Sequence, residues 1–310
     1  MKKFLITGGA GFIGSHIVEE LVNSGARVRV LDNFSSGREE NLKAFRNKIE
    51  LLKDDIRDPA ACLKACRGMD FILHQAALRS VPRSLKDPRE YNEVNINGTL
   101  NMLEAARRIK AKSFIFASSS SIYGEALRFP QKESDLPRLI SPYALSKLAG
   151  EYYCRIFSLH YGLPTVSLRY FNVFGPRQAL DDEYAVVIPK FIACIMDNEH
   201  PPVYGSGKQS RDFTFVKNVV SANLAAIRKN SLQGRVFNIA SGRPYAILEL
   251  VRILNRLIGK NISPVFLKPR PGDVFKTHAD LADSKKLLKF TPEIGFIEGL
   301  KQTVEYFKER

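Results

Sequence analysis

The sequence predicts an α/β fold in which a doubly wound parallel sheet is joined to a smaller α/β domain. The first observation is that short apolar runs alternate with helical patterns through the first half of the 310 residues. This alternation is typical of a parallel sheet with helices on both faces. The second observation is that the alternation stops after Tyr170, and that proline and glycine become frequent between Pro201 and Gly207. The second half is therefore expected to form a smaller domain that lends some strands to the main sheet.

Six apolar runs in the first half predict the strands of the main sheet. They are residues 3–7, 28–32, 49–55, 70–75, 112–119 and 165–170. A helix is expected over about residues 11–24, because Ile13, Ile17 and Leu21 recur at helical spacing and Gly25 follows as a stop. In the second half, three isolated strands and a final helix are expected, at residues 211–216, 235–240, 264–268 and about 294–307.

The excess of positive charge is spread along the chain. Lysine and arginine total 47 against 32 acidic residues, which gives a net charge of +15. Such an excess is compatible with nucleic acid, a membrane surface or an anionic small ligand. The basic residues form no run of five, and no zinc-finger or RNP pattern is present. A solvated cationic surface that binds no nucleic acid is expected.

Neither export nor membrane insertion is expected. No apolar run approaches the ~20 residues that span a bilayer. The basic start of the chain reaches glycine after a few apolar positions, whereas a signal peptide has about 7–15 apolar residues. Cys62, Cys66, Cys154 and Cys194 form no CxxC pair. These features indicate a reduced, cytoplasmic compartment and no metal centre.

Three glycines mark a dinucleotide site. Gly8, Gly11 and Gly14 form G-x-x-G-x-x-G between the first strand and the first helix. Glycines let the backbone approach a pyrophosphate, and the helix N-terminus offers free N–H groups. Asp32 ends the second strand near the expected ~20-residue spacing, where it would accept both ribose hydroxyls and repel a 2′-phosphate. A Rossmann-type NAD site is predicted, with NADP left open by the nearby Arg38.

Two later strand ends are expected to continue the same groove. Asp55 and Ile56 follow the third strand, where adenine should lie. Ala76 and Ala77 follow the fourth strand, near the pyrophosphate.

A tyrosine and a lysine share one face of a predicted helix. Ser141 and Pro142 suit its N-cap and first turn, which places Tyr143 and Lys147 four residues apart. A free tyrosine has a pKa near 10 and is only about 0.1% ionised at neutral pH. Lys147, the helix N-terminus and a cationic nicotinamide would all favour the phenolate. Such a pair is common on ordinary helices, but the serines at 118–121 end the fifth strand, where doubly wound sheets hold ligands.

With these motifs in this order, the sequence resembles the extended short-chain dehydrogenase/reductase family, and within it the nucleoside-diphosphate-sugar 4-epimerases. The matching stretches run over nearly the whole chain. They are TGGAGFIG, Asp32-Asn33, DDIRD, HQAA, NINGT, FASSSSIYG, YALSK, RYFNVFG, SRDF and RPGD. The resemblance implies an NAD-dependent isomerase that converts UDP-GlcNAc/UDP-GalNAc, and UDP-Glc/UDP-Gal, through a 4-keto intermediate. A UDP-glucuronate 4-epimerase and an NAD-dependent sugar-nucleotide reductase are the alternatives.

The resemblance implies three catalytic residues. They are Ser119, Tyr143 and Lys147. In the family the catalytic serine stands four residues before the tyrosine of a Tyr-Gly pair, which here is Tyr123-Gly124. Ser118 and Ser120 are the nearest alternatives for this role. Ser120-Ser121 stand where the dehydratases carry Asp-Glu, which argues against dehydration.

The resemblance also implies the binding residues. The cofactor contacts would be Gly8, Gly11, Phe12, Ile13, Gly14, Asp32, Asn33, Asp55, Ile56, Gln75, Ala76, Ala77, Asn95, Tyr143, Lys147 and Tyr170. The substrate contacts would be Ser119, Ser120, Tyr143, Asn172, Val187, Tyr204, Arg211, Arg270, Asp273 and Thr277. Arginines suit a diphosphate, and a carboxylate suits ribose hydroxyls. The structural alternatives are an ion pair of Arg211 with Asp212 or a neighbour, and a turn cap at Asp273.

Two positions bear on the choice of sugar. HQAALRSVPRS resembles the epimerases of UDP-N-acetylhexosamines, although Arg79 stands where a glycine is usual. Thr277 falls at the position that gates sugar size in the family, and its small side chain would admit an N-acetyl group. A smaller sugar in the same space is penalised by only ~1–3 kcal/mol, so both kinds are expected to react.

The resemblance finally implies two domains and a homodimer. Residues 1–168 with about 210–240 would bind NAD, and about 169–209 with 241–310 would bind the UDP-sugar. The subunits would pair through two helices, at about residues 90–109 and 141–160.

Overall fold

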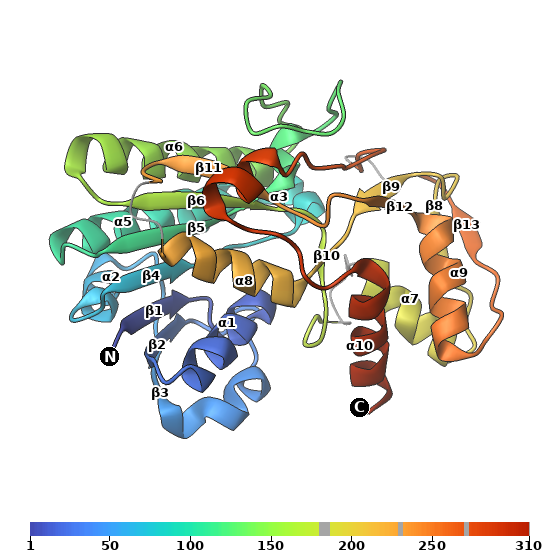
Figure 1. The fold of residues 1–310 in the computed structure, drawn as a ribbon, viewed down its shortest axis with the longest axis horizontal. Coiled ribbons are helices and arrows are strands. Elements are labelled where there is room, and N and C mark those ends of the chain that lie inside the picture. Colours follow the sequence, from blue (N-terminus) through green and yellow to red (C-terminus); the bar gives the residue numbers. More distant parts are fainter. Residues whose placement is uncertain (180–186, 229–231, 270–272, 310) are drawn as a thin grey trace.

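The computed structural model describes residues 1–179, 187–228, 232–269 and 273–309 (Figure 1). Its centre is a seven-stranded parallel sheet with the order β11-β6-β5-β4-β1-β2-β3. The strands are β1 (Lys3–Thr7), β2 (Arg27–Asp32), β3 (Ile49–Lys53), β4 (Phe71–His74), β5 (Ser113–Ser119), β6 (Thr165–Tyr170) and β11 (Arg235–Ile239). From β1 the chain builds outwards on one side and then on the other, so the strand order reverses between β1 and β4. The predicted doubly wound, Rossmann-type fold is confirmed, and ligands of such sheets bind beside this reversal.

Helices cover both faces of the sheet because alternate strand residues point to opposite sides. Phe4 and Ile6 pack with α1 and α8, whereas Leu5 packs with α2, α5 and α6. In Figure 1, α6 and α8 lie on opposite sides of β5 and β6. These layers contain α1 (Phe12–Asn23), α2 (Pro59–Cys66), α5 (Gly98–Arg108), α6 (Pro142–Tyr161) and α8 (Val216–Ile227). Shorter helical segments are η1 (Glu39–Lys48), α3 (Val81–Lys86), α4 (Pro88–Tyr91), η2 (Asn92–Asn97), η3 (Ser120–Tyr123) and η4 (Ser284–Leu288).

The remaining elements form a smaller unit at the right of Figure 1. Its strands pair two by two, as β10 with β7, β12 with β9 and β13 with β8. They are β7 (Val173–Phe174), β8 (Pro202–Tyr204), β9 (Ser210–Asp212), β10 (Thr214–Phe215), β12 (Pro244–Ala246) and β13 (Val265–Leu267). Its helices are α7 (Val187–Met196), α9 (Ile247–Ile258) and α10 (Phe296–Lys308). An aromatic cluster fills the core, where Phe213 and Phe296 stack with ring centroids 5.2 Å apart.

The structure corrects one predicted strand. Residues 211–216 were expected to form a single strand, but they divide between β9, β10 and the start of α8. The two short strands have different partners, since β9 pairs with β12 and β10 with β7. Asp212 at the break is fully buried, and its carboxylate accepts hydrogen bonds from Ser241, Gly242 and Ala279. The division of the chain into the two domains stays a prediction.

Among the described residues, no helix is both long and apolar enough to cross a membrane.

Candidate active site

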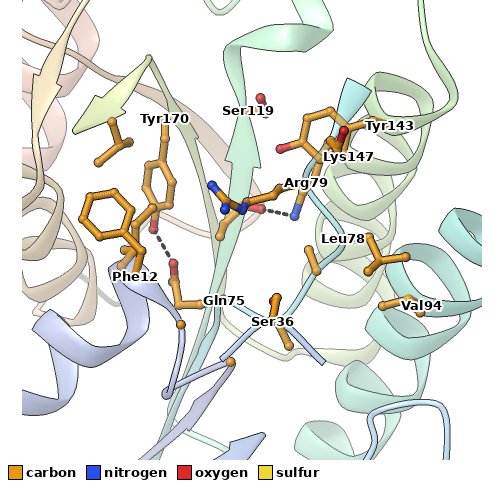
Figure 2. A pocket seen from close by; sticks show the side chains of 18 of the residues that line it. Phe12, Ser36, Gln75, Leu78, Arg79, Val94, Ser119, Tyr143, Lys147 and Tyr170 are labelled. Atoms are coloured by element: carbon orange, nitrogen blue, oxygen red, sulfur yellow. Dashed lines mark hydrogen bonds between the residues drawn. The ribbon is translucent and has the colours of Figure 1, made fainter. Parts of the chain in front are cut away.

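A cavity of about 650 Å³ opens at the carboxyl ends of the central strands. Residues that follow β1, β2, β4, β5 and β6 line it, and the smaller unit closes one side. Figure 2 shows Ser119, Tyr143 and Lys147 on one wall, with Phe12 and Tyr170 on the other. The cavity therefore collects predicted catalytic, cofactor and substrate residues in one space.

The glycine turn forms a cradle that has no room for side chains. Gly8 has φ +65°, and a Cβ there would lie 2.8 Å from Cα of Ala76. A Cβ on Gly14 would collide with the carbonyl oxygen of Gly8. No side chain caps α1, and no acidic residue lies in its first turn. The N–H groups at the start of α1 thus remain available to an anion, which fits the pyrophosphate of the predicted NAD.

Asp32 lies beside this cradle. Its carboxylate accepts hydrogen bonds from the backbone N–H groups of Ala10 and Phe34, both at 2.8 Å. Burial raises the pKa of Asp32, while these two hydrogen bonds act in the opposite direction. The carboxylate is held in place at the cavity wall, and its remaining lone pairs suit ribose hydroxyls.

Ser119 and Tyr143 form the proposed reactive pair. Ser119 ends β5, and Tyr143 lies in the first turn of α6. Burial raises the pKa of Tyr143, whereas the nearby Ser119 side chain and the positive charge of Arg79 lower it. Ser141 is the N-cap of α6 and accepts from the N–H of Ala144 at 3.1 Å, as the sequence predicts. The helix start therefore fixes where the phenol lies.

Lys147 follows Tyr143 by one helical turn. Its Nζ donates to the carbonyl oxygen of Ala117 at 2.9 Å and lies 5.1 Å from the centroid of the Phe116 ring. Burial lowers the pKa of Lys147 to about 7. The lysine is thus attached to the end of β5, on the same wall as the predicted catalytic Ser119 and Tyr143 (Figure 2).

A buried ion pair attaches α6 to the sheet a further turn along. Glu151 on α6 binds Arg169 on β6 through two hydrogen bonds of 2.8 Å. Ser118 also donates to Glu151, at 2.5 Å. Both charged side chains are about 95% buried. The α6 helix is thus joined to β6 through Arg169. It is joined to β5 through two consecutive residues, because Lys147 binds Ala117 and Glu151 binds Ser118.

Tyr170 forms the opposite wall of the cavity. Its hydroxyl donates to Gln75 at 3.2 Å (Figure 2) and accepts from Nδ2 of Asn223 at 2.8 Å. Sequence reasoning missed Asn223, although a polar residue on the apolar face of α8 is a usable signal. The hydroxyl is held by two amide side chains, and Tyr170 lines the cavity where the nicotinamide is predicted to bind.

The smaller unit contributes Asn172, Arg211, Asp273 and Thr277 to the cavity. Arg211 pairs with Asp273, whose Oδ1 lies 2.6 Å from Nη2. Asp212, the alternative partner, instead binds Ser241 and its neighbours. The two predicted UDP contacts therefore meet in one ion pair that lines the cavity.

Four predicted contacts do not line the cavity, and their roles stay predictions. They are Asp55, Asn95, Val187 and Tyr204. The Asp55 carboxylate is bound by Nη2 of Arg57 and Nδ2 of Asn33, both at 2.8 Å, and hydrogen bonding to Arg57 lowers its pKa to about 2. Val187 begins α7, which packs in the aromatic core, and Tyr204 pairs with Leu267 between β8 and β13.

Asn95 supports the cavity from behind. Its Oδ1 accepts from the N–H of Leu78 at 2.8 Å, and its Nδ2 donates to the carbonyl of Leu78 and to Ser146, both at 3.0 Å. It lies in the π-helical segment η2, a geometry that often occurs at functional sites. Asn95 thus joins the wall segment after β4 to α6.

Arg270 lies outside the described residues. All other predicted contacts line the cavity, among them Ile56, Ala77 and Ser120.

Sequence reasoning also missed much of the arginine rim. The cavity is lined by Arg38, Arg57, Arg79, Arg83, Arg177 and Arg211. Arg177 belongs to the loop after β7, and its Nη2 lies 2.6 Å from Glu19 on α1. These arginines come from segments far apart in the chain, so no local motif marks them as a group. A rim of this charge suits ligands that carry diphosphates.

Comparisons with known proteins agree with this arrangement. Residues 4–240 match the model of the NAD dependent epimerase/dehydratase family. A putative UDP-glucose 4-epimerase of Methanocaldococcus jannaschii is 37% identical over 306 residues, which cover 98% of each chain. The solved UDP-N-acetylglucosamine 4-epimerase of Methanobrevibacter ruminantium, in complex with UDP-N-acetylmuramic acid, is 41% identical with a TM-score of 0.95. The match covers 99% of this chain and 98% of that one.

A second solved structure is similarly close. The UDP-glucose 4-epimerase of Thermotoga maritima, with UDP-glucose, is 38% identical with a TM-score of 0.94, over 99% of this chain and 98% of that one. The glycine cradle and Asp32 of this chain fit the NAD on which the matched family depends. By sequence, fold and site, the chain belongs to the NAD dependent epimerase/dehydratase family.

Proposed function

We propose that this protein is a UDP-sugar 4-epimerase that interconverts UDP-GlcNAc with UDP-GalNAc and UDP-Glc with UDP-Gal. One observation carries the proposal. Ser119 and Tyr143 line the same cavity as the glycine cradle and the Arg211–Asp273 ion pair. Relatives that act on UDP-GlcNAc and on UDP-glucose support the same activity.

Tyr143 is the proposed base for the 4-hydroxyl of the sugar. Ser119 would share the proton of this hydroxyl, since it lines the cavity together with the phenol. In its charged form Lys147, four residues along the same helix, would favour the phenolate over the phenol. When bound, NAD supplies the hydride acceptor and donor for the sugar carbon.

The same tyrosine serves both epimers, so the sugar has to turn while the nucleotide stays in place. Arg211 can bind the diphosphate with its guanidinium, and Asp273 can accept from ribose hydroxyls. Both groups line the cavity and form an ion pair with each other. Retention of the nucleotide in this way keeps the oxidised sugar beside Tyr143.

The choice of sugar rests on the space at Thr277. This residue lines the cavity and carries a small side chain, which leaves room for an N-acetyl group. An unsubstituted hexose in the same space loses little binding energy, as in other apolar pockets.

The purified protein is expected to convert UDP-GlcNAc and UDP-Glc to their 4-epimers without added cofactor. Each substrate, with UDP-glucuronate as a third, is incubated separately and the products are separated by chromatography. Conversion of UDP-glucuronate alone would identify the protein as a UDP-glucuronate 4-epimerase instead. If none is converted by protein whose spectrum confirms bound NAD, the epimerase proposal fails, and net consumption of added NADH would indicate a reductase.

We also propose that the protein forms a homodimer in the cytoplasm through the outer face of α6. Leu145, Tyr152, Ile156 and Leu159 are 42–65% exposed and recur at helical spacing. An apolar stripe of this kind is typical of a helix that packs on a partner. The cytoplasmic location is supported separately by the four free cysteines of the protein, which suit a reducing compartment.

Replacing Ile156 with glutamate is expected to shift the protein from dimer to monomer in analytical ultracentrifugation. The new carboxylate would lie in the centre of the apolar stripe, where burial is costly. Lys301→Glu, an exposed position on α10, serves as the control for the added negative charge. A wild-type protein that sediments as a monomer would contradict the dimer.

A further inference from the structure

Thr277 lines the cavity, and its hydroxyl also forms two hydrogen bonds within the protein. It is 95% buried, and its hydroxyl bridges two segments of the smaller unit. The Oγ1 atom accepts from the backbone N–H of Asp212 at 3.0 Å. The same Oγ1 donates to Oδ1 of Asn172 at 2.9 Å.

These two bonds determine which end of the Asn172 amide faces the cavity. A threonine hydroxyl has only one proton. The N–H of Asp212 can only donate, so Oγ1 accepts there, and among the described residues the side chain of Asn172 offers the one acceptor for the hydroxyl proton. The amide oxygen of Asn172 must then be the atom at Thr277, and the amide NH₂ must point the other way.

The orientation leaves a donor for the ligand. Asn172 lines the cavity, and among the described residues its Nδ2 has no hydrogen-bond partner. Asn172 has a positive φ of 31°, and its carbonyl oxygen accepts from the N–H of Thr214 at 3.2 Å. Backbone and side chain are therefore both held, and the N–H groups are oriented before any ligand arrives.

We infer that Thr277 is a positioning residue for nucleotide binding: its hydroxyl fixes the Asn172 amide so that an N–H donor faces a phosphate oxygen of the UDP-sugar. The inference rests on the proposed function, because it takes a nucleoside diphosphate as the ligand. It adds a hydrogen-bonding role to the size of the side chain. An amide turned the other way would present its oxygen to the negatively charged phosphates.

Size and hydrogen bonding can be separated at this position. Valine has nearly the shape of threonine but no hydroxyl, whereas serine keeps the hydroxyl and is smaller. A pure size gate predicts that Thr277→Val behaves as wild type and that serine widens the sugar pocket. The positioning role predicts that valine impairs binding and that serine preserves it. UDP is the informative ligand, because it carries the diphosphate but lacks the hexose whose size the pocket would select.

The experiment is isothermal titration of UDP into the purified NAD-containing protein. Thr277→Val is expected to weaken UDP binding by about tenfold or more, as for the loss of one hydrogen bond to a charged group. Thr277→Ser is expected to bind UDP as wild type does. Thr214→Val is the matched control, since Thr214 is also fully buried beside Asn172 but its hydroxyl has no partner among the described residues.

A double-mutant cycle tests whether the effect passes through Asn172. In the Asn172→Ala background, Thr277→Val is expected to cause little further loss of UDP affinity. Thr277→Ala provides a second variant if valine prevents folding, because its smaller side chain leaves room for a water at the N–H of Asp212. In steady-state assays the hydroxyl-free variants are expected to raise KM for UDP-GlcNAc more than they lower kcat.

The outcomes separate the two proposals. Wild-type affinity for UDP in Thr277→Val or Thr277→Ala would overturn the positioning role while the epimerase activity stood. An equal loss in Thr214→Val would overturn it as well, since the effect would then be general to this core. A wild-type protein that binds no UDP would instead overturn the proposed function.

Discussion

Replacing Tyr143 with phenylalanine is expected to lower kcat for 4-epimerisation by about 10²- to 10⁴-fold, the usual contribution of a general acid or base. The substitution removes only the phenol oxygen, which is the proposed proton acceptor. The ring remains in contact with Tyr91, at a centroid distance of 6.3 Å, so the wall of the cavity keeps its shape. Bound NAD, measured by absorbance after denaturation, and UDP affinity, measured by calorimetry, are expected to stay at wild-type levels.

A matched control is available on the same helix. Tyr161→Phe makes the same change at a side chain that is 51% exposed at the C-terminal end of α6. It is expected to leave kcat unchanged. Undiminished turnover in Tyr143→Phe would remove this tyrosine from the mechanism. A parallel loss of bound NAD would show that the substitution damages the site rather than the chemistry.

Replacing Glu151 with alanine is expected to reduce the free energy of unfolding by about 3–5 kcal/mol, because it leaves the charge of Arg169 buried without its carboxylate. Both side chains are about 95% buried, so water cannot take the place of the missing partner. Ser118 loses its acceptor in the same variant. Urea denaturation followed by circular dichroism measures the loss as a lower midpoint.

An exposed ion pair provides the comparison. Glu104 and Arg108 lie four residues apart on α5, with an N–O distance of 4.0 Å and side chains that are 47% and 61% exposed. Glu104→Ala is expected to cost less than about 1 kcal/mol, because solvent screens such pairs. Equal losses in the two variants would mean that the Glu151–Arg169 pair contributes no more than a surface contact.

The main sheet could be predicted because its signals are local. Each strand is a short apolar run, and β1, β5 and β6 begin and end within one residue of the predicted bounds. The smaller unit was harder, since its strands contain only two or three residues. Whether Arg211 and Thr214 belong to one strand or two depends on the partners β12 and β7, and those lie far away in the chain.

The residues of the candidate site likewise fall into those that local spacing predicts and those whose partners depend on the fold. Tyr143 and Lys147 are related by one turn of helix, so their spacing alone places them together. The roles of Asn95 and Asp55 depend on which neighbour the folded chain offers to an amide or a carboxylate. Asn95 binds Leu78, and Asp55 binds Arg57. Residue type and motif identify such groups as polar and important, but only the three-dimensional arrangement decides whether they meet a ligand or another residue.

The two sides of the cavity differ in how freely they can change over evolutionary time. Tyr143 and Lys147 share one rigid helix, which is attached to β5 and β6 by buried contacts. Asn172, Arg211 and Thr277 lie on short strands and connections of the smaller unit. On the proposed roles, substitutions among the latter would alter the accepted sugar while the proton-transfer groups stay where they are. A change of sugar preference would then not require the proton-transfer groups to be rebuilt.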